Sequence, residues 1–130
     1  MFYIKKMQKK LIFNQKMLKK PYFFEKIASS IFLLFSFEIN IPRIIICSNI
    51  AETKLLESEL ASKCYVEKIK KVNISSFKKI VHYGEFDLGI VFSKSKDIYS
   101  LKFLSGSGDE LSSVKFSIIE NYFLTNEILE

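Results

Sequence analysis

The sequence predicts an α/β fold in which a small, open, four-stranded parallel sheet carries flanking helices and follows an α-helical N-terminal extension. Two short apolar runs, at 43–47 and 86–93, have the unbroken hydrophobicity of strands that are buried on both faces. An amphipathic helical pattern begins soon after the first run, at Ala51. Strands that alternate with helices in this way are typical of a parallel sheet with crossover connections.

The basic charge of the chain is confined to its N-terminal part. Residues 1–41 contain eight lysines and two glutamates, a net charge of +6, which equals the net charge of the whole chain. Residues 42–130 are therefore neutral overall, so the charge is no argument for nucleic-acid binding by the chain as a whole. We expect a helical extension over 1–41, a link at Asn40-Ile41-Pro42, and an α/β domain over 42–130.

Two helices are predicted within the extension. Apolar residues at helical spacing predict the first over 2–20, and Pro21 ends it. The second runs from Tyr22 to about Phe37 and is apolar around most of its circumference, which requires burial against a partner. The longest apolar run, 31–37, is far shorter than the about 20 residues that span a membrane.

The first half of the α/β domain is predicted to contain two strands and one helix. The strand at 43–47 is followed by a helix over Ala51–Lys63 with leucines on its inward face. Residues Tyr65–Val72 alternate between apolar and charged side chains, which is typical of an exposed or edge strand. Cys47 and Cys64 would lie at opposite ends of the helix, roughly 20 Å apart and too far for a disulfide. We therefore expect reduced thiols and a cytoplasmic protein.

The second half of the domain continues the same alternation. Ser75-Ser76 is expected to cap a short helix that ends at Gly84. The strand at 86–93 comes next, and alternating apolar residues predict a fourth strand over Ile98–Leu104. The loop at 105–109 lacks the Lys and Ser/Thr of a phosphate-binding P-loop, so we interpret it as a flexible connector.

A long helix over Leu111–Glu130 is predicted to close the chain. Helical spacing of its apolar residues predicts an inward face and a second apolar flank beside it. The predicted inward face consists of Leu111, Val114, Ile118, Tyr122 and Leu129, and the second flank of Phe116, Ile119 and Phe123.

Cys47 is the candidate for chemistry, because it ends a buried strand at the edge where α/β sheets place their ligands. A thiol at a helix N-terminus can be a reactive thiolate, but a free cysteine is also a common small residue of buried strands. Both interpretations remain open from the residues alone. His82 is the sole histidine, and no cluster has metal-ligand spacing, so we expect no metal and no cofactor.

From Arg43 onward the sequence resembles the IIB components of the bacterial sugar phosphotransferase system. In that family a phosphorylated cysteine ends the first strand, in a loop of the type C-G-x-G-x-G-T-S. Cys47 matches the cysteine and Thr53 the threonine six positions on, while residues 86–91 are similar to the family's third strand. The resemblance implies Cys47 as phosphoryl acceptor, with Ser48, Asn49 and Thr53 as phosphate ligands, on a Rossmann-type sheet.

The loop departs from the family pattern at its glycines. Ser48, Ile50 and Glu52 stand at the three glycine positions, so the backbone is less free to wrap a phosphate. A carboxylate at Glu52 complements the helix dipole and repels an anion. Asn49 and Glu52 also fit a capping box. We interpret the loop as the remnant of a phosphorylation loop.

Degenerate IIB-like domains occur at the C-terminus of regulators that carry phosphotransferase regulation domains, including the Mga-type virulence regulators. Residues 1–41 are similar to the last helices of such a regulation domain. The resemblance implies a C-terminal module or truncated fragment of a phosphotransferase-responsive transcriptional regulator. Such a module would act as a homo-oligomer rather than as an enzyme, with phosphotransferase relay proteins as further partners and without direct DNA contact.

Two alternative functions stay open. The first is a free-standing IIB phosphocarrier, an enzyme component that uses Cys47. The second is a basic amphipathic protein of the membrane surface, led by residues 1–37.

Overall fold

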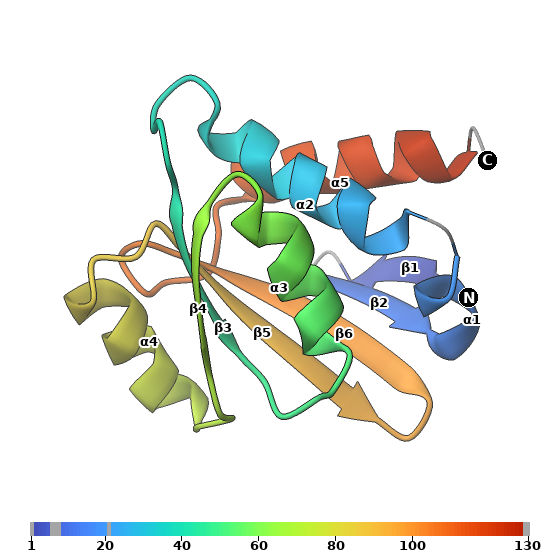
Figure 1. The fold of residues 1–130 in the computed structure, drawn as a ribbon, viewed down its shortest axis with the longest axis horizontal. Helices are drawn as coiled ribbons and strands as arrows, with labels where there is room; N and C mark the ends of the chain where they lie inside the picture. Colours follow the sequence, from blue (N-terminus) through green and yellow to red (C-terminus); the bar gives the residue numbers. More distant parts are fainter. Residues whose placement is uncertain (1, 6–8, 21, 129–130) are drawn as a thin grey trace.

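The computed structural model describes residues 2–5, 9–20 and 22–128, with side chains described for 9–20 and 22–122. Within these residues one mixed sheet of six strands has the order β1-β2-β6-β5-β3-β4 (Figure 1). The strands are β1 Phe2–Lys5, β2 Lys10–Asn14, β3 Arg43–Cys47, β4 Tyr65–Ile69, β5 Leu88–Ser95 and β6 Ile98–Ser105. The helices are α1 Gln15–Leu18, α2 Phe23–Phe35, α3 Thr53–Ala61, α4 Ile74–Tyr83 and α5 Ser113–Ile128.

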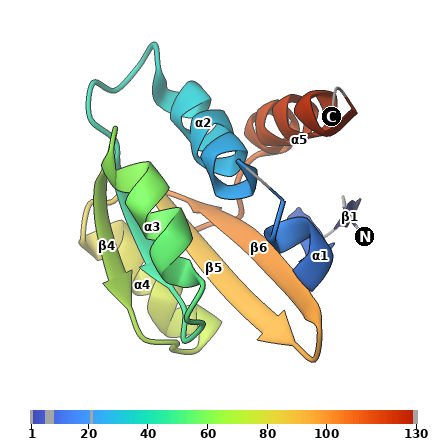
Figure 2. The same cartoon turned by 45° about the vertical axis from the view of Figure 1, so that its right-hand side comes forward.

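Helices cover the two faces of the sheet unequally. Figure 2 shows α2, α3 and α5 over one face and α4 on the other. Consecutive residues of a strand point to opposite faces, so Ile44 and Ile46 lie in the large core under α2, α3 and α5, whereas Ile45 and Cys47 lie in the smaller core under α4. β3 is therefore buried on both faces, as its apolar run predicts.

The α/β class is confirmed, and several elements form where they are expected. The strand at 43–47, the helix from Tyr22 and the helix after the first strand are present as β3, α2 and α3. β4 is an edge strand, as its charged residues predict. Gly84 ends α4, but the cap of α4 is Asn73, whose Oδ1 accepts from Ser76 N at 2.8 Å, and not Ser75-Ser76.

The prediction of four parallel strands is wrong. β3 runs parallel to β4 and β5, while β5–β6, β6–β2 and β2–β1 are antiparallel. Only Lys96 and Asp97 separate β5 from β6, and a parallel crossover needs a dozen or more residues. Lys96 adopts a positive φ of 57°, the conformation that a tight hairpin turn demands.

The predicted helix over 2–20 is also wrong, and so is the purely helical extension. This segment forms β1, β2 and the short helix α1, whose first turn Asn14 caps by accepting from Met17 N at 3.0 Å. β2 pairs with β6, and Leu11 and Phe13 are fully buried on the same face of the sheet. The predicted boundary between residues 41 and 42 thus falls in the connection between α2 and β3, and strands before and after it belong to one sheet. Pro21, which was expected to end the helix, lies outside the described residues.

The buried face of α5 differs from the predicted inward face. Phe116 and Ile119, expected as a second flank, pack in the large core with Leu111. Val114 is 74% exposed, and Ile118 is exposed as well. Tyr122 is half-buried, while Leu129 and the side chain of Phe123 lie outside the described part of the chain. Among the described residues no helix combines the length and apolarity that crossing a membrane requires.

Replacing Phe13 with Ala tests whether β2 belongs to the sheet. Phe13 is fully buried and stacks on Tyr99 at 5.6 Å between ring centroids, so we expect a loss of about 3–5 kcal/mol in the free energy of unfolding. Urea denaturation measures the loss. Leu55→Ala, at a position that is 54% exposed, is the matched control and should cost under about 1 kcal/mol. A similarly small loss for Phe13→Ala would contradict the strand.

Candidate functional site

The loop after β3 lies where an open α/β sheet usually binds its ligands. From β3 the chain passes through α3 on one face of the sheet to β4. From β4 it passes through α4 on the other face to β5, so that β4 and β5 lie on opposite sides of β3. The carboxyl ends of β3 and β5 therefore form the topological switch point of the sheet. The candidate residues Cys47, Ser48, Asn49 and Thr53 all belong to this region.

Cys47 is enclosed in the smaller core. Its side chain is 1% exposed, and its Sγ lies 3.8 Å from the carbonyl oxygen of Lys70. α4 covers this part of the sheet closely because Gly89 has no side chain: a Cβ there would lie 2.5 Å from Val81. The thiol is therefore not presented to solvent or to a partner protein.

The two hydroxyl groups of the loop are bonded to each other. Ser48 Oγ and Thr53 Oγ1 are 2.7 Å apart, and both residues are buried. Ser48 Oγ also accepts from Ile50 N at 3.1 Å. The structure thus brings Ser48 and Thr53 together, and they stabilise the turn into α3 with their own hydrogen bonds.

The first amides of α3 are also engaged. The N–H groups of Thr53, Lys54 and Leu55 donate to the carbonyl oxygens three residues before them, at 3.0 to 3.3 Å. Asn49 turns away from the helix, and its Oδ1 accepts from Lys71 N at 2.8 Å. The predicted capping box is therefore wrong, since Glu52 makes no side-chain capping bond either.

Glu52 instead joins a polar cluster that sequence reasoning missed. The buried hydroxyl of Tyr99 donates to Glu52 Oε2 at 2.5 Å and lies 2.8 Å from Gln15 Oε1. Lys94 places its Nζ 5.2 Å from the centroid of the Tyr99 ring. These residues come from α1, the loop before α3, and both strands of the β5–β6 hairpin. No spacing in the sequence signals a contact between segments so far apart.

The hydrogen bonds and charges of this cluster shift the pKa values of three of its residues. The hydrogen bond from Tyr99 is the main cause that lowers the pKa of Glu52. Burial, followed by the bond to the carboxylate, raises the pKa of Tyr99, and the Tyr99 hydroxyl raises that of Lys94. Glu52 is thus held as a carboxylate by a neutral phenol and a nearby ammonium group. The cluster stabilises the fold and has no free nucleophile.

A solvent-facing cavity of about 710 Å³ adjoins the loop. Two lysines, Lys68 and Lys70, stand on its β4 side. Its lining consists of Ser48, Asn49, Ile50, Ala51, Lys68, Ile69 and Lys70. Among the residues that the structure describes, no group of three or more His, Cys, Asp or Glu side chains is placed to hold a metal ion.

Comparison with known proteins supports the fold alone. No family model and no curated protein sequence matches the chain. A solved structure described provisionally as a phosphomannomutase, from Thermus thermophilus, is similar over 77% of this chain, with a TM-score of 0.63 and 13% sequence identity. The match spans 25% of that protein, so this α/β arrangement recurs there as one part of a longer chain.

Replacing Tyr99 with Phe tests the polar cluster, because it removes the hydroxyl from Glu52 and keeps the aromatic ring. We expect a loss of about 1.5–3 kcal/mol in unfolding free energy near pH 7, the range for a hydrogen bond to a charged group. The folded-state pKa of Glu52 lies below its ordinary value of 4.5, so its contribution is complete above 4.5 and disappears as the pH falls through the lower folded value. The difference between wild type and variant should therefore shrink in acid.

Urea unfolding at a series of pH values measures this difference. Tyr83→Phe, at an exposed position on α4, is the matched control and should leave stability unchanged at every pH. An equal loss for Tyr99→Phe in acid and at neutral pH would show that Glu52 is not the acceptor that matters.

Proposed function

We propose that this chain is a non-catalytic module that acts through contact with other proteins, with a second copy of itself as the expected partner. The observation that carries the proposal is the enclosure of Cys47, which is 1% exposed beneath α4. The loop beside it is closed by the hydrogen bonds of Ser48, Thr53 and the first amides of α3. A phosphoryl donor would have to open this structure before it could reach the thiol.

The specific form that we propose is a IIB-like module of a phosphotransferase-responsive transcriptional regulator. The support is local and comes from β3, the loop that begins at Cys47, and α3, which follows that loop and begins at Thr53. β1 and β2 lie outside that resemblance, which begins at Arg43, and β6, the fourth strand that it implies, is antiparallel instead of parallel. The proposal therefore depends on the switch-point region and not on the whole sheet.

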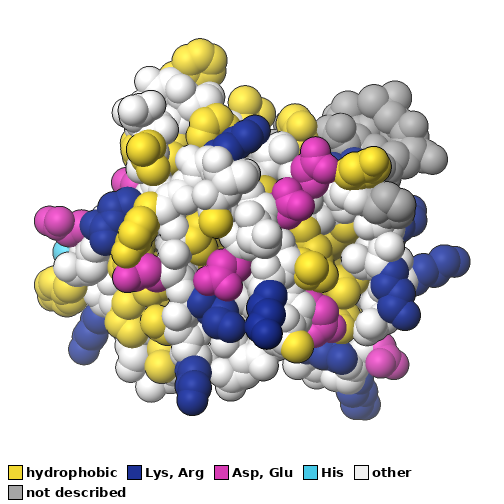
Figure 3. Space-filling view, in the orientation of Figure 1, with side chains coloured by type: hydrophobic (Ala, Val, Ile, Leu, Met, Phe, Trp, Pro, Cys, Tyr) yellow, Lys and Arg dark blue, Asp and Glu magenta, His cyan; other side chains and the backbone are white. Residues whose placement is uncertain are grey.

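Exposed apolar residues on two neighbouring helices support self-association. Figures 1 and 2 show α2 and α5 side by side and running in opposite directions. Leu33, Val114 and Ile118 are exposed on them, and Phe37, just after α2, is 97% exposed. Figure 3 shows hydrophobic side chains at the surface around the connection from α2 to β3. We call these four residues the α2–α5 patch, and apolar patches of this kind are typical of protein contacts.

The double variant Phe37→Glu/Ile118→Glu tests this contact. Removing two apolar side chains from an interface costs about 1.5–3 kcal/mol for each fully buried one, so we expect the dimer dissociation constant to rise at least about 10-fold. Sedimentation equilibrium of the full chain measures it. Tyr83→Glu, at a 78% exposed position on α4, is the matched control. A monomeric wild type, or a double variant that associates like wild type, would contradict the proposal.

The phosphocarrier alternative has one observation in its favour, the cavity beside the loop with Lys68 and Lys70 on its rim. Lysines at the mouth of such a cavity attract a phosphoryl group. The membrane alternative was led by residues 1–37, and residues 10–14 of that segment form β2 rather than part of an amphipathic helix.

A phosphotransfer assay separates the regulatory module from the phosphocarrier. Labelled phosphoenolpyruvate and the general relay proteins of the phosphotransferase system are incubated with the full chain and with Cys47→Ser. Because Cys47 is buried, we expect no label on either protein, while a known IIB component in the same mixture is labelled. Label on the wild-type chain that Cys47→Ser abolishes would overturn the proposal in favour of the phosphocarrier.

A further inference from the structure

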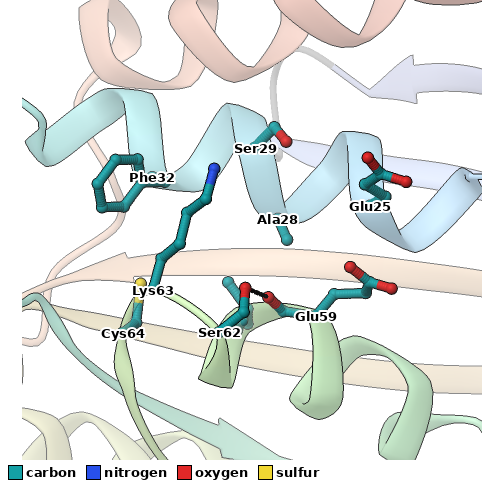
Figure 4. Close-up of a pocket in the computed structure, with 9 residues that line it drawn as sticks. Glu25, Ala28, Ser29, Phe32, Glu59, Ser62, Lys63 and Cys64 are labelled. Carbon is teal, nitrogen blue, oxygen red and sulfur yellow. Dashed lines mark hydrogen bonds between the residues drawn. The ribbon is translucent and has the colours of Figure 1, made fainter.

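A small, partly enclosed cavity lies between α2 and α3, away from the switch point. Its volume is about 130 Å³. An apolar cavity of about 150 Å³ accommodates benzene, which has six non-hydrogen atoms, so this cavity suits a ligand of that size. Its lining consists of Glu25, Ala28, Ser29, Phe32, Glu59, Leu60, Ser62, Lys63 and Cys64 (Figure 4).

The charged groups of this cavity are separated by sign. Figure 4 shows the carboxylates of Glu25, on α2, and Glu59, on α3, at the same end of the cavity. Lys63 extends toward the other end, where its Nζ lies 5.2 Å from the centroid of the Phe32 ring. The cavity thus offers negative charge at one end and positive charge at the other.

The remaining lining is compact and largely apolar. Ala28 and Leu60 are buried, and Cys64 is buried beside them. Burial raises the pKa of Cys64 to about 11, so its thiol is neutral at physiological pH and adds no charge. The hydroxyl of Ser29 lies between the two charged ends in Figure 4. Ser62 Oγ is already occupied, because it donates to the carbonyl oxygen of Glu59 at 2.8 Å.

We propose that the α2–α3 cavity binds a small zwitterion of the α-amino acid class, a function beyond the contact role proposed above. The ammonium group lies between Glu25 and Glu59, and the carboxylate lies against the Nζ of Lys63. A small side chain, of the size of a hydrogen or a methyl group, packs on Ala28 and Leu60. A volume of about 130 Å³ favours small amino acids over larger ones.

The separation of charges selects this class over simple ions. A plain anion meets two carboxylates, and a plain cation meets Lys63, so each is repelled by one end of the cavity. A molecule with both charges satisfies both ends at once. Because the ligand has only about six non-hydrogen atoms, we expect a dissociation constant on the order of millimolar.

An NMR titration of the full ¹⁵N-labelled chain tests the proposal, with L-alanine as the probe and acetate, ethylamine and L-phenylalanine as comparisons. L-Alanine should shift amide resonances of α2 and α3, at residues 25–32 and 59–64. Its dissociation constant should be at least about 10-fold lower than those of the three comparison compounds. Acetate and ethylamine each lack one of the two charged groups, and L-phenylalanine has a side chain larger than the cavity favours.

Variants test whether L-alanine binding depends on the cavity or on other charges of α3. Lys63→Met keeps the length of the side chain and Glu25→Gln its shape, and each should weaken L-alanine binding at least about 10-fold. Lys54→Met and Glu57→Gln change the same kinds of charge on α3 outside the cavity lining and should bind like wild type. All four positions keep solvent contact, so the variants should fold, as the amide spectrum of each will show.

Three results would overturn the proposal. The first is that L-alanine at tens of millimolar leaves the α2 and α3 resonances unchanged. The second is that acetate, ethylamine or L-phenylalanine binds as well as L-alanine. The third is that Lys63→Met binds like wild type while it is folded.

Discussion

The fold depends on the placement of one side chain, Tyr99, which is fully buried near the start of β6. Its ring stacks on Phe13 of β2, with an interplanar angle of 5°, and lies 6.0 Å from the ring of Phe92 in β5. Its hydroxyl contacts Gln15, 84 residues away, and Glu52, 47 residues away. A phenol is suited to this position because its ring packs in the apolar core while its hydroxyl donates to the partly exposed carboxylate of Glu52. Tyr99 thereby joins the N-terminal hairpin, the loop before α3 and the β5–β6 hairpin.

Long-range contacts of this kind explain which strands and helices can be predicted from the sequence and which cannot. β3, β5, α2 and α3 are specified by their own patterns, and they form where those patterns indicate. The segment over 2–20 carries apolar residues at helical spacing, but residues 10–14 become a strand because β6 offers a partner to Leu11 and Phe13. Tertiary pairing overrides a weak helical pattern in such cases. The antiparallel β6 was foreseeable, since the four residues between the predicted strands at 86–93 and 98–104 are too few for a crossover.

The position of the candidate site was predictable from the sequence, but the accessibility of its thiol and the hydrogen-bond partners of its side chains were not. Cys47 does end a buried strand at the carboxyl edge of the sheet, and Ser48 and Thr53 do meet in the loop. Whether the thiol is accessible depends on α4, which approaches closely because Gly89 lies under Val81, and sequence spacing does not reveal that contact. The partner of Glu52 depends on β6, so the capping pattern with Asn49 predicted the wrong bond. Local rules describe a loop well only while no distant residue competes for its side chains.

The N-terminal segment has a consequence for function as well as for folding. By pairing β2 with β6, it carries α2 onto the face of the sheet that α3 and α5 also cover. One side of α2 then forms the small cavity with α3, and the other side forms the exposed apolar patch with α5. At the switch point, where ligands usually bind in α/β folds, Ser48 and Thr53 are bonded to each other beside the cavity that Lys68 and Lys70 border. The helical layer thus offers a ligand or a partner two surfaces besides that cavity. Since α2 borders both surfaces, the small cavity and the α2–α5 patch share one helix.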